Sequence, residues 1–226
     1  MSENIRVAID GPSGAGKSTL AKMLAEALGY LYVDTGAIYR TVGLSACRRG
    51  VDPGDGAAVV PMLAGLDIDL RHGEDGLQHM YLDGEDVTDE IRRPEISKYA
   101  SAVSALPQVR AFLMDMQREL ARRQNVIMDG RDIGTVVLPG ADVKIFLTAA
   151  PEDRAKRRYA ELLQRGHGGD YETVLRDIIQ RDENDTRRAA APLRQAEDAL
   201  LVDTTGNSLE ESFDVLLNTI KERLDP

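Results

Sequence analysis

The sequence predicts an α/β fold in which helices flank a parallel sheet. Short apolar runs alternate along the chain with longer segments of helical periodicity, which is the pattern of a parallel sheet covered on both faces. Directly behind the first apolar run, residues 11–18 read Gly-Pro-Ser-Gly-Ala-Gly-Lys-Ser, a phosphate-binding loop in its strand–turn–helix context. The length of 226 residues suits a single domain of this class with appendages.

The elements follow from the same pattern. Strands are expected at 5–9, 30–33, 125–128, 143–147 and 200–202. Helices are expected at 17–28, 37–48, 107–123, 151–164, 171–188 and 208–223. The first helix carries one apolar stripe and is followed by Gly29, where a C-terminal cap would stand. The last helix opens with Ser208 and Glu211 at the spacing of a capping box.

Residues 67–97 break this alternation. Residues 67–70 and 80–82 read as short strands, joined through Arg71-His-Gly-Glu-Asp-Gly and followed by Asp83-Gly. We therefore expect a small β-rich insertion with hairpin turns. Two roles remain open for this insertion: it could simply stabilise the fold, or it could act as a flap that moves over a substrate.

The loop at 11–18 predicts a nucleoside triphosphate site. Its glycines let backbone N–H groups turn toward phosphate oxygens, where a Cβ would block the approach. Lys17 adds a charge near the outer phosphates, Ser18 is the usual Mg²⁺ ligand, and the following helix directs its positive end at the same anion. The residues expected to hold ATP are Gly11, Pro12, Ser13, Gly14, Ala15, Gly16, Lys17, Ser18 and Thr19.

Composition excludes several classes of function. A net charge of −10 argues against a nucleic-acid surface, which needs a basic face. No apolar run approaches the length of a membrane span and no signal peptide is recognised, so we expect a cytosolic protein without membrane partners. Cys47 is the single cysteine, which leaves no disulfide framework or thiolate metal cluster. His72, His79 and His167 lack metal-ligand spacing and are expected at the surface.

Arginine concentrates at three places in this acidic chain. Arg154, Arg157 and Arg158 share one helix face, with Arg165 ahead of a glycine-rich turn. Arg131 follows Asp129-Gly130 at the end of an apolar strand, where ligands of open α/β sheets bind. The third group, together with its acidic neighbours, comprises Arg181, Asp182, Asp185, Arg187 and Arg188. A solvated helix face laced with ion pairs is the alternative interpretation of the first group.

Massed arginines suit phosphoryl transfer between two phosphorylated molecules. Such catalysis is mainly positioning plus stabilisation of charge by Mg²⁺, Lys and Arg. An acceptor phosphate has a second pKa near 6 and is largely ionised at pH 7, so no general base is needed. Two other interpretations stay open: a kinase acting on a hydroxyl group, which would need a base such as Asp34 or Asp132, and a nucleotide switch without turnover.

The chain resembles the bacterial cytidylate kinases nearly from end to end. The segments that carry the resemblance are 9–19, 34–40 (Asp-Thr-Gly-Ala-Ile-Tyr-Arg), 101–110, 129–135 (Asp-Gly-Arg-Asp-Ile-Gly-Thr), 181–188 and 191–193 (Ala-Pro-Leu). The resemblance implies the P-loop nucleoside monophosphate kinase fold as one domain, residues 1–226, with the insertion at 67–97 and a helical lid at 153–169. It also implies ATP-dependent conversion of CMP or dCMP to the diphosphate, and we expect Mg²⁺ as the cofactor and a monomeric protein.

The same resemblance implies roles for individual residues. The acceptor phosphate would be gathered by Thr35, Arg40, Arg131 and Arg181, the cytosine edge read by Ser101, Arg110 and Asp132, and the sugar hydroxyls held by Asp185 with Arg188. Arg157 would join the ATP site, Asp129 would assist Ser18 with Mg²⁺, and the catalytic cations would be Lys17, Arg131, Arg154, Arg158 and Arg181. A carboxylate at Asp132 can accept from the amine of cytosine but would face a carbonyl of uracil. Thr35 departs from the Ser expected there, although the hydroxyl is kept.

Overall fold

The computed structural model describes residues 4–73, 76–164, 166 and 170–224. The chain forms two compact units. The first combines residues 1–32 with residues 121–226, and the second comprises residues 33–120.

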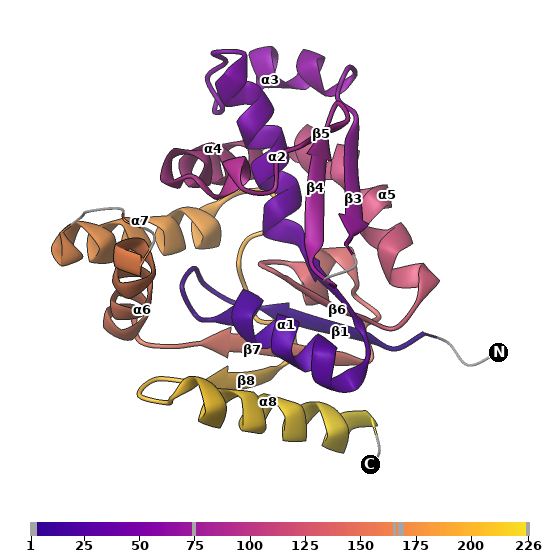
Figure 1. The fold of residues 1–226 in the computed structure, drawn as a ribbon, viewed down its shortest axis with the longest axis vertical. Helices are drawn as coiled ribbons and strands as arrows, with labels where there is room; N and C mark the ends of the chain where they lie inside the picture. Colours follow the sequence, from indigo (N-terminus) through magenta and orange to yellow (C-terminus); the bar gives the residue numbers. More distant parts are fainter. Residues whose placement is uncertain (1–3, 74–75, 165, 167–169, 225–226) are drawn as a thin grey trace. The chain divides into compact units, whose positions relative to one another are not determined.

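A parallel sheet organises the first unit (Figure 1). Its order is β2-β6-β1-β7-β8, and β1 pairs in parallel with both β6 and β7, as β7 does with β8. The strands are β1 (Arg6–Asp10), β2 (Leu31–Asp34), β6 (Val126–Gly130), β7 (Val143–Thr148) and β8 (Leu200–Asp203). Asp10 lies in register with Gly130, so the phosphate loop and the segment after β6 leave the same edge of the sheet.

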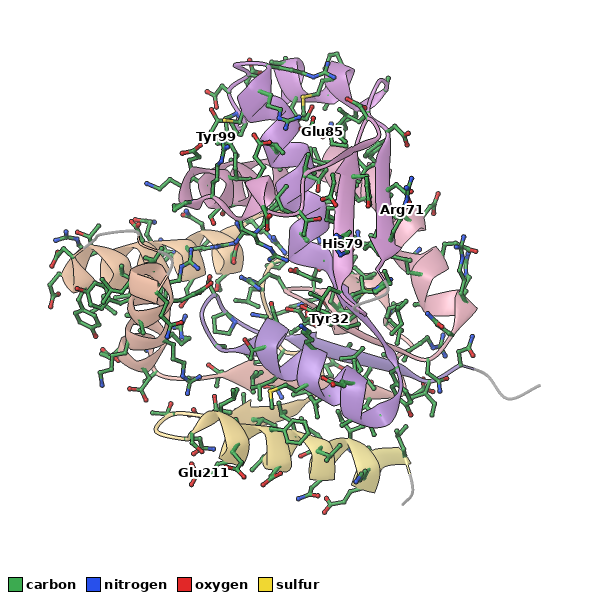
Figure 2. The ribbon with its side chains drawn as sticks, viewed as in Figure 1. Tyr32, Arg71, His79, Glu85, Tyr99 and Glu211 are labelled. Carbon is green, nitrogen blue, oxygen red and sulfur yellow. The ribbon has the colours of Figure 1, made fainter. Side chains whose placement is uncertain are left out.

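Two helices cover one face of this sheet. Apolar residues of α1 (Lys17–Leu28) and α8 (Leu209–Leu224) form a single buried core with β1, β6, β7 and β8. Gly29 ends α1 in the left-handed conformation, and Ser208 and Glu211 form the expected reciprocal bonds ahead of α8 (Figure 2). Both capping predictions are confirmed.

A helical hairpin also belongs to the first unit. Figure 1 shows α6 (Pro151–Gln164) and α7 (Tyr171–Arg187) side by side, and Ala155, Val174 and Ile178 form their own small core. The bounds of α6 match the prediction, whereas α7 ends one residue earlier than expected.

The second unit combines helices with a small antiparallel sheet in the order β3-β4-β5 (Figure 1). Asp83 and Gly84 both have positive φ, 52° and 82°, as a two-residue hairpin between β4 and β5 requires. The elements that lie wholly in this unit are α2 (Thr35–Arg48), α3 (Gly56–Leu63), β3 (Ile68–His72), β4 (Gln78–Leu82), β5 (Glu85–Asp86), η1 (Glu90–Arg92) and α4 (Pro94–Ser104). Helix α5 (Pro107–Arg123) begins in it.

The structure confirms the strands of the expected insertion and corrects its end. Residues 90–97 are not β-structure, because η1 is followed by Pro94, which starts α4 from the N1 position that proline favours. Of the expected turn at 71–76, residues 74 and 75 lie outside the described part of the chain. His72 and His79 lie on β3 and β4 (Figure 2 labels the latter), and His167 is outside the described residues.

Besides the short β5 and η1, three longer elements were not predicted. Helix α3 contains glycine, two valines and Pro61, and forms because Asp55 accepts the N–H groups of Ala57 and Ala58. A π-helix, η2 (Ile133–Val137), is built from a sequence that reads as strand or loop, Ile-Gly-Thr-Val-Val. Helix α4 lies against α2 in the second unit and was not expected as a separate element.

Candidate active site

The phosphate loop is fixed by the strand beside it. A Cβ on Gly11, where φ is 151°, would stand 1.9 Å from the backbone oxygen of Leu147 on β7, so only glycine fits. Gly16, in the left-handed conformation, leads into α1 with no side chain capping that helix. The first backbone N–H groups of α1 therefore remain able to donate hydrogen bonds to a bound anion.

Lys17 is buried at the centre of this loop. Its Nζ donates to the carbonyl of Pro12 at 2.7 Å. Burial lowers the pKa of Lys17 well below its usual range, and Arg131 and Arg181 lower it further, against Asp129 and Asp10. A phosphate anion at this point would relieve both effects.

Arg131 and Arg181 form a cationic cluster with Lys17. Arg131 Nε donates to Asp185 Oδ2 at 3.0 Å, and the Nε of Arg181 is buried without a hydrogen-bond partner among the described residues. Burial, and then Arg131, lower the pKa of Arg181 to about 10. Burial alone would raise the pKa of Asp185, but Arg131, Arg181 and Arg188 hold it below its ordinary value. The cluster is therefore built for additional negative charge.

The arginines of α6 contact the protein backbone around the loop. Arg154 is buried; it donates to the carbonyls of Ala149 and Ser13 at 2.8 and 2.9 Å, and pairs with Asp182 at 2.6 Å. Arg157 donates to the carbonyls of Thr204 at 2.8 Å and Ala15 at 3.4 Å. These two side chains hold the phosphate loop in shape from the outside.

Arg158, a further arginine of the expected lid, does not share the backbone contacts of Arg154 and Arg157. Arg158 pairs with Glu161 on its own helix at 2.8 Å, and it adds to the positive field at Arg181. Helix α6 supplies most of residues 153–169, whereas Arg165 and residues 167–169 lie outside the described part of the chain.

A carboxylate network adjoins the loop. Asp129 at the end of β6 accepts from Ser18 Oγ at 2.9 Å through Oδ2 and from Tyr32 Oη at 3.0 Å through Oδ1. Tyr32 reaches it from β2 (Figure 2). The described residues contain no cluster of three metal-ligating side chains. A hydroxyl and one carboxylate nevertheless fit Mg²⁺ that completes its shell with water and nucleotide oxygens.

Asp132 follows this network along the chain. Its Oδ1 lies 3.4 Å from Arg188 Nη2, and Arg188 Nε donates to the carbonyl of Ala191 at 2.6 Å. The two residues after Asp132 are held by β1: Asp10, at the end of that strand, accepts the backbone N–H groups of Ile133 and Gly134, each at 2.7 Å. The structure therefore brings Asp132 and Arg188 together, as it does Arg131 and Asp185.

The second unit holds the other residues expected at the acceptor. Thr35 is buried at the start of α2, where Gln78 brackets the backbone of Asp34 with bonds of 2.8 and 3.1 Å. Arg40 donates to Ser97 Oγ at 2.7 Å and to the carbonyl of Ile91 at 3.3 Å.

Arg110 lies between two elements of the same unit. Its guanidinium is 5.4 Å from the ring centroid of Tyr39 and donates to the carbonyl of Ser104 at 3.2 Å. Ser104 in turn donates to the carbonyl of Ser101 at 2.8 Å, so Ser101 and Arg110 are linked through one residue. Such an arrangement can present a hydroxyl and a guanidinium to a planar ligand.

Comparison with known proteins shows the family to which the chain belongs. The cytidylate kinase family model matches residues 7–222. The chain belongs to the cytidylate kinase family. It is 53% identical over 215 residues to the cytidylate kinase of Caldicellulosiruptor bescii, which covers 95% of each chain. It is 48% identical over 221 residues to the cytidylate kinase of Carboxydothermus hydrogenoformans, which covers 98% of this chain and 99% of the relative.

Solved structures show likeness in fold alone. An uncharacterized protein from Eubacterium ventriosum has a TM-score of 0.54 at 13% identity, covering 97% of this chain and 99% of the other. Membership of the cytidylate kinase family makes the protein a nucleoside monophosphate kinase, a phosphotransferase that uses ATP. No helix among the described residues is long and apolar enough to cross a membrane.

Three side chains next to the predicted site residues were not predicted from the sequence. Tyr32 donates to the predicted Asp129, whereas Asp10 and Gln78 hold the backbone next to the predicted Asp132 and Thr35. A signal existed for Asp10, a charged residue that ends an otherwise apolar strand. None existed for Gln78, because its partner is a backbone 44 positions away.

Proposed function

We propose that the protein transfers the γ-phosphoryl group of ATP to CMP and dCMP, giving CDP and dCDP. The observation that carries the proposal is the cationic cluster of Lys17, Arg131 and Arg181. Arg131 lowers the pKa of both Lys17 and Arg181, Arg181 also lowers that of Lys17, and the buried Nε of Arg181 has no hydrogen-bond partner among the described residues. Two phosphorylated substrates would supply the negative charge that this cluster lacks.

The transfer we propose is direct. An oxygen of the ionised CMP phosphate attacks the γ-phosphorus of ATP, the bond from that phosphorus to the β,γ-bridging oxygen breaks, and ADP leaves with the electron pair. The acceptor phosphate is largely ionised at pH 7, so no side chain has to remove a proton. Lys17, Arg131 and Arg181 stabilise the charge on the transferred group, and Arg154 and Arg158 assist from α6.

Mg²⁺ is the cofactor of the proposed reaction. Bound with ATP, it would neutralise charge on the β- and γ-phosphate oxygens. Ser18 would be its ligand, and Asp129 would act indirectly, because its oxygens already accept from Ser18 and Tyr32. The phosphate loop from Gly11 to Thr19 holds the nucleotide, with Arg157 beside it.

Asp132 is proposed to read the base together with Ser101 and Arg110. Its carboxylate accepts a hydrogen bond from the amine of cytosine, whereas uracil would place a carbonyl against it. Thr35 and Arg40 are assigned to the acceptor phosphate, and Asp185 with Arg188 to the sugar hydroxyls.

A spectrophotometric assay of ADP production with CMP, dCMP, UMP and AMP tests the substrate assignment. CMP and dCMP should be the preferred acceptors, and a protein that prefers another monophosphate would contradict the proposal. Asp132→Ala should lower the preference for CMP over UMP by about tenfold or more, the effect of losing one specific base contact. Its affinity for ATP, measured by titration calorimetry, should stay within about twofold.

We further propose that residues 153–169 act as a lid and that the protein works as a monomer. A closed lid would exclude water that could otherwise hydrolyse ATP. Small-angle scattering with and without a bisubstrate analogue should show a smaller radius of gyration in the complex, at the mass of one chain. Unchanged dimensions would contradict the lid, and a dimer mass would contradict the monomer.

A further inference from the structure

The π-helix η2 begins at Ile133, one residue after Asp132. The first N–H groups of a helix have no partner within it, and an Asp at the N-cap position usually accepts one of them. Asp132 occupies that position, with φ −147° and ψ 25°, yet its side chain makes no capping hydrogen bond. Its carboxylate lies instead beside Arg188, at 3.4 Å.

Another residue caps η2 from a different strand. Asp10, at the end of β1, accepts the N–H of Ile133 through Oδ1 and the N–H of Gly134 through Oδ2, both at 2.7 Å. Asp10 is only 4% exposed, so both bonds are shielded from water. The next residue along the chain is Gly11, the first of the phosphate loop.

The contact between Asp10 and the backbone at Gly134 is close. A Cβ on Gly134 would lie 3.4 Å from Asp10 Oδ2 and 3.2 Å from the Cδ of Lys144. A Cβ there would be tight against Lys144 but in ordinary contact with Asp10, so the close approach is shown by the two hydrogen bonds of 2.7 Å. Burial raises the pKa of Asp10 to about 6, against the two N–H donors, and the group is mostly ionised at pH 7.5.

We infer that Asp10 is a positioning residue for base recognition: it caps η2 in place of Asp132, and so keeps the Asp132 carboxylate off the η2 backbone and beside Arg188. The inference rests on the proposed function, in which Asp132 reads cytosine. Without Asp10, the N–H groups of η2 would need another acceptor. The nearest in sequence is Asp132 itself, since Asp is among the best N-cap residues.

Asp10→Asn tests this inference. Asparagine keeps the shape but accepts through one oxygen only, and its NH₂ group faces the second backbone donor. The ratio of kcat/KM for CMP to that for UMP should fall about tenfold, the effect of one misplaced buried hydrogen bond. The KM for ATP should change less than the CMP-to-UMP ratio, because the side chain of Asp10 bonds to η2 rather than to the phosphate loop and acts on Lys17 through its charge.

Asp142→Asn is the matched control. Asp142 also accepts a backbone N–H at 2.7 Å, from Arg6 at the opposite end of the same strand. It should leave the CMP-to-UMP ratio unchanged. A double variant, Asp10→Asn with Asp132→Ala, should have the ratio of Asp132→Ala alone, because Asp10 acts through Asp132.

Each outcome decides between two hypotheses. A folded Asp10→Asn protein with the wild-type ratio would overturn the inference, as would losses that simply add in the double variant. If Asp10→Asn does not fold, Asp10→Glu keeps the carboxylate but moves its oxygens by one methylene, and should lower the ratio in the same direction; an unchanged ratio there would equally overturn the inference. A wild-type protein that does not prefer CMP would contradict the proposed function instead.

Discussion

Removing the charge of Arg181 should make the protein more stable and nearly inactive. Its pKa is lowered from 12.5 to about 10, first by burial and then by Arg131, which means that the charged form is disfavoured in the folded state. At pH 7.5 Arg181 is charged in both the folded and unfolded states, so this cost is fully present. At 1.36 kcal/mol per pKa unit the cost is about 3 kcal/mol.

Arg181→Met keeps an unbranched side chain of similar length and removes the charge. The neighbouring carboxylates retain partners, since Asp185 pairs with Arg131 at 3.0 Å and Asp182 with Arg154 at 2.6 Å. Because Arg181 is not fully shielded from solvent, we expect a gain of about 1–3 kcal/mol. At about 2–4 °C per kcal/mol for a chain of this size, Tm should rise by roughly 3–10 °C.

Urea unfolding in phosphate-free buffer at pH 7.5 measures this gain, and Arg187→Met is the matched control. Arg187 belongs to the same helix, but its side chain is 80% exposed, so its replacement should change stability by less than about 0.5 kcal/mol. Activity of Arg181→Met should fall by about 10³ or more. Loss of more than about 1 kcal/mol in Arg181→Met, with Arg187→Met neutral, would refute the idea that unpaired positive charge strains the apo site.

Three further results are expected. Tyr32→Phe removes a hydrogen-bond donor to Asp129, the carboxylate beside the proposed Mg²⁺ position. The Mg²⁺ concentration for half-maximal ATP binding, measured by calorimetry, should therefore rise severalfold. Tyr30→Phe should leave this concentration unchanged, and equal effects of the two variants would contradict the assignment. Gly11→Ala places a Cβ 1.9 Å from the Leu147 oxygen and should cost more than about 3 kcal/mol in chemical denaturation, whereas a loss under about 1 kcal/mol would show that β7 can yield. Since the folded state raises the pKa of Asp10 from 3.8 to about 6, its contribution to stability is complete below pH 4 and lost as the pH rises through 6. Relative to Asp10→Asn, the wild type should therefore lose up to about 3 kcal/mol between pH 4 and 7 in urea titrations, and a constant difference would contradict this.

The sequence was sufficient for the sheet and most helices, because their apolar periodicity is strong. Predicted strands ended too early where a polar residue continues the ladder, as Asp10 does in β1 and Asp34 does in β2. Those residues finish the strand while their side chains serve other elements. An apolar pattern carries no signal for such a residue.

For the candidate site, too, some residues could be predicted from the sequence and others could not. The phosphate loop is contiguous in sequence, so its spacing alone predicts its chemistry, and Arg131 and Asp132 follow from their place at a strand end. The partners that hold these residues come from distant segments: Tyr32 is 97 positions from Asp129, and Asp10 is 123 from Ile133. Local pattern cannot supply such pairs, and η2 escaped prediction for the related reason that its capping residue lies on another strand.

The anchoring of α6 to the phosphate loop limits how the helical hairpin can move. Arg154 fastens the first turn of α6 to the carbonyl of Ser13 and to Asp182 of α7, and Arg157 adds the carbonyl of Ala15 one turn later. If the proposed lid closes, these contacts would keep the start of α6 with the phosphate loop, so that within residues 153–169 the movement would fall beyond Arg157. On that proposal, a fluorophore at Leu163, whose side chain is exposed, should change its emission when both substrates bind, whereas one at Lys156 should not.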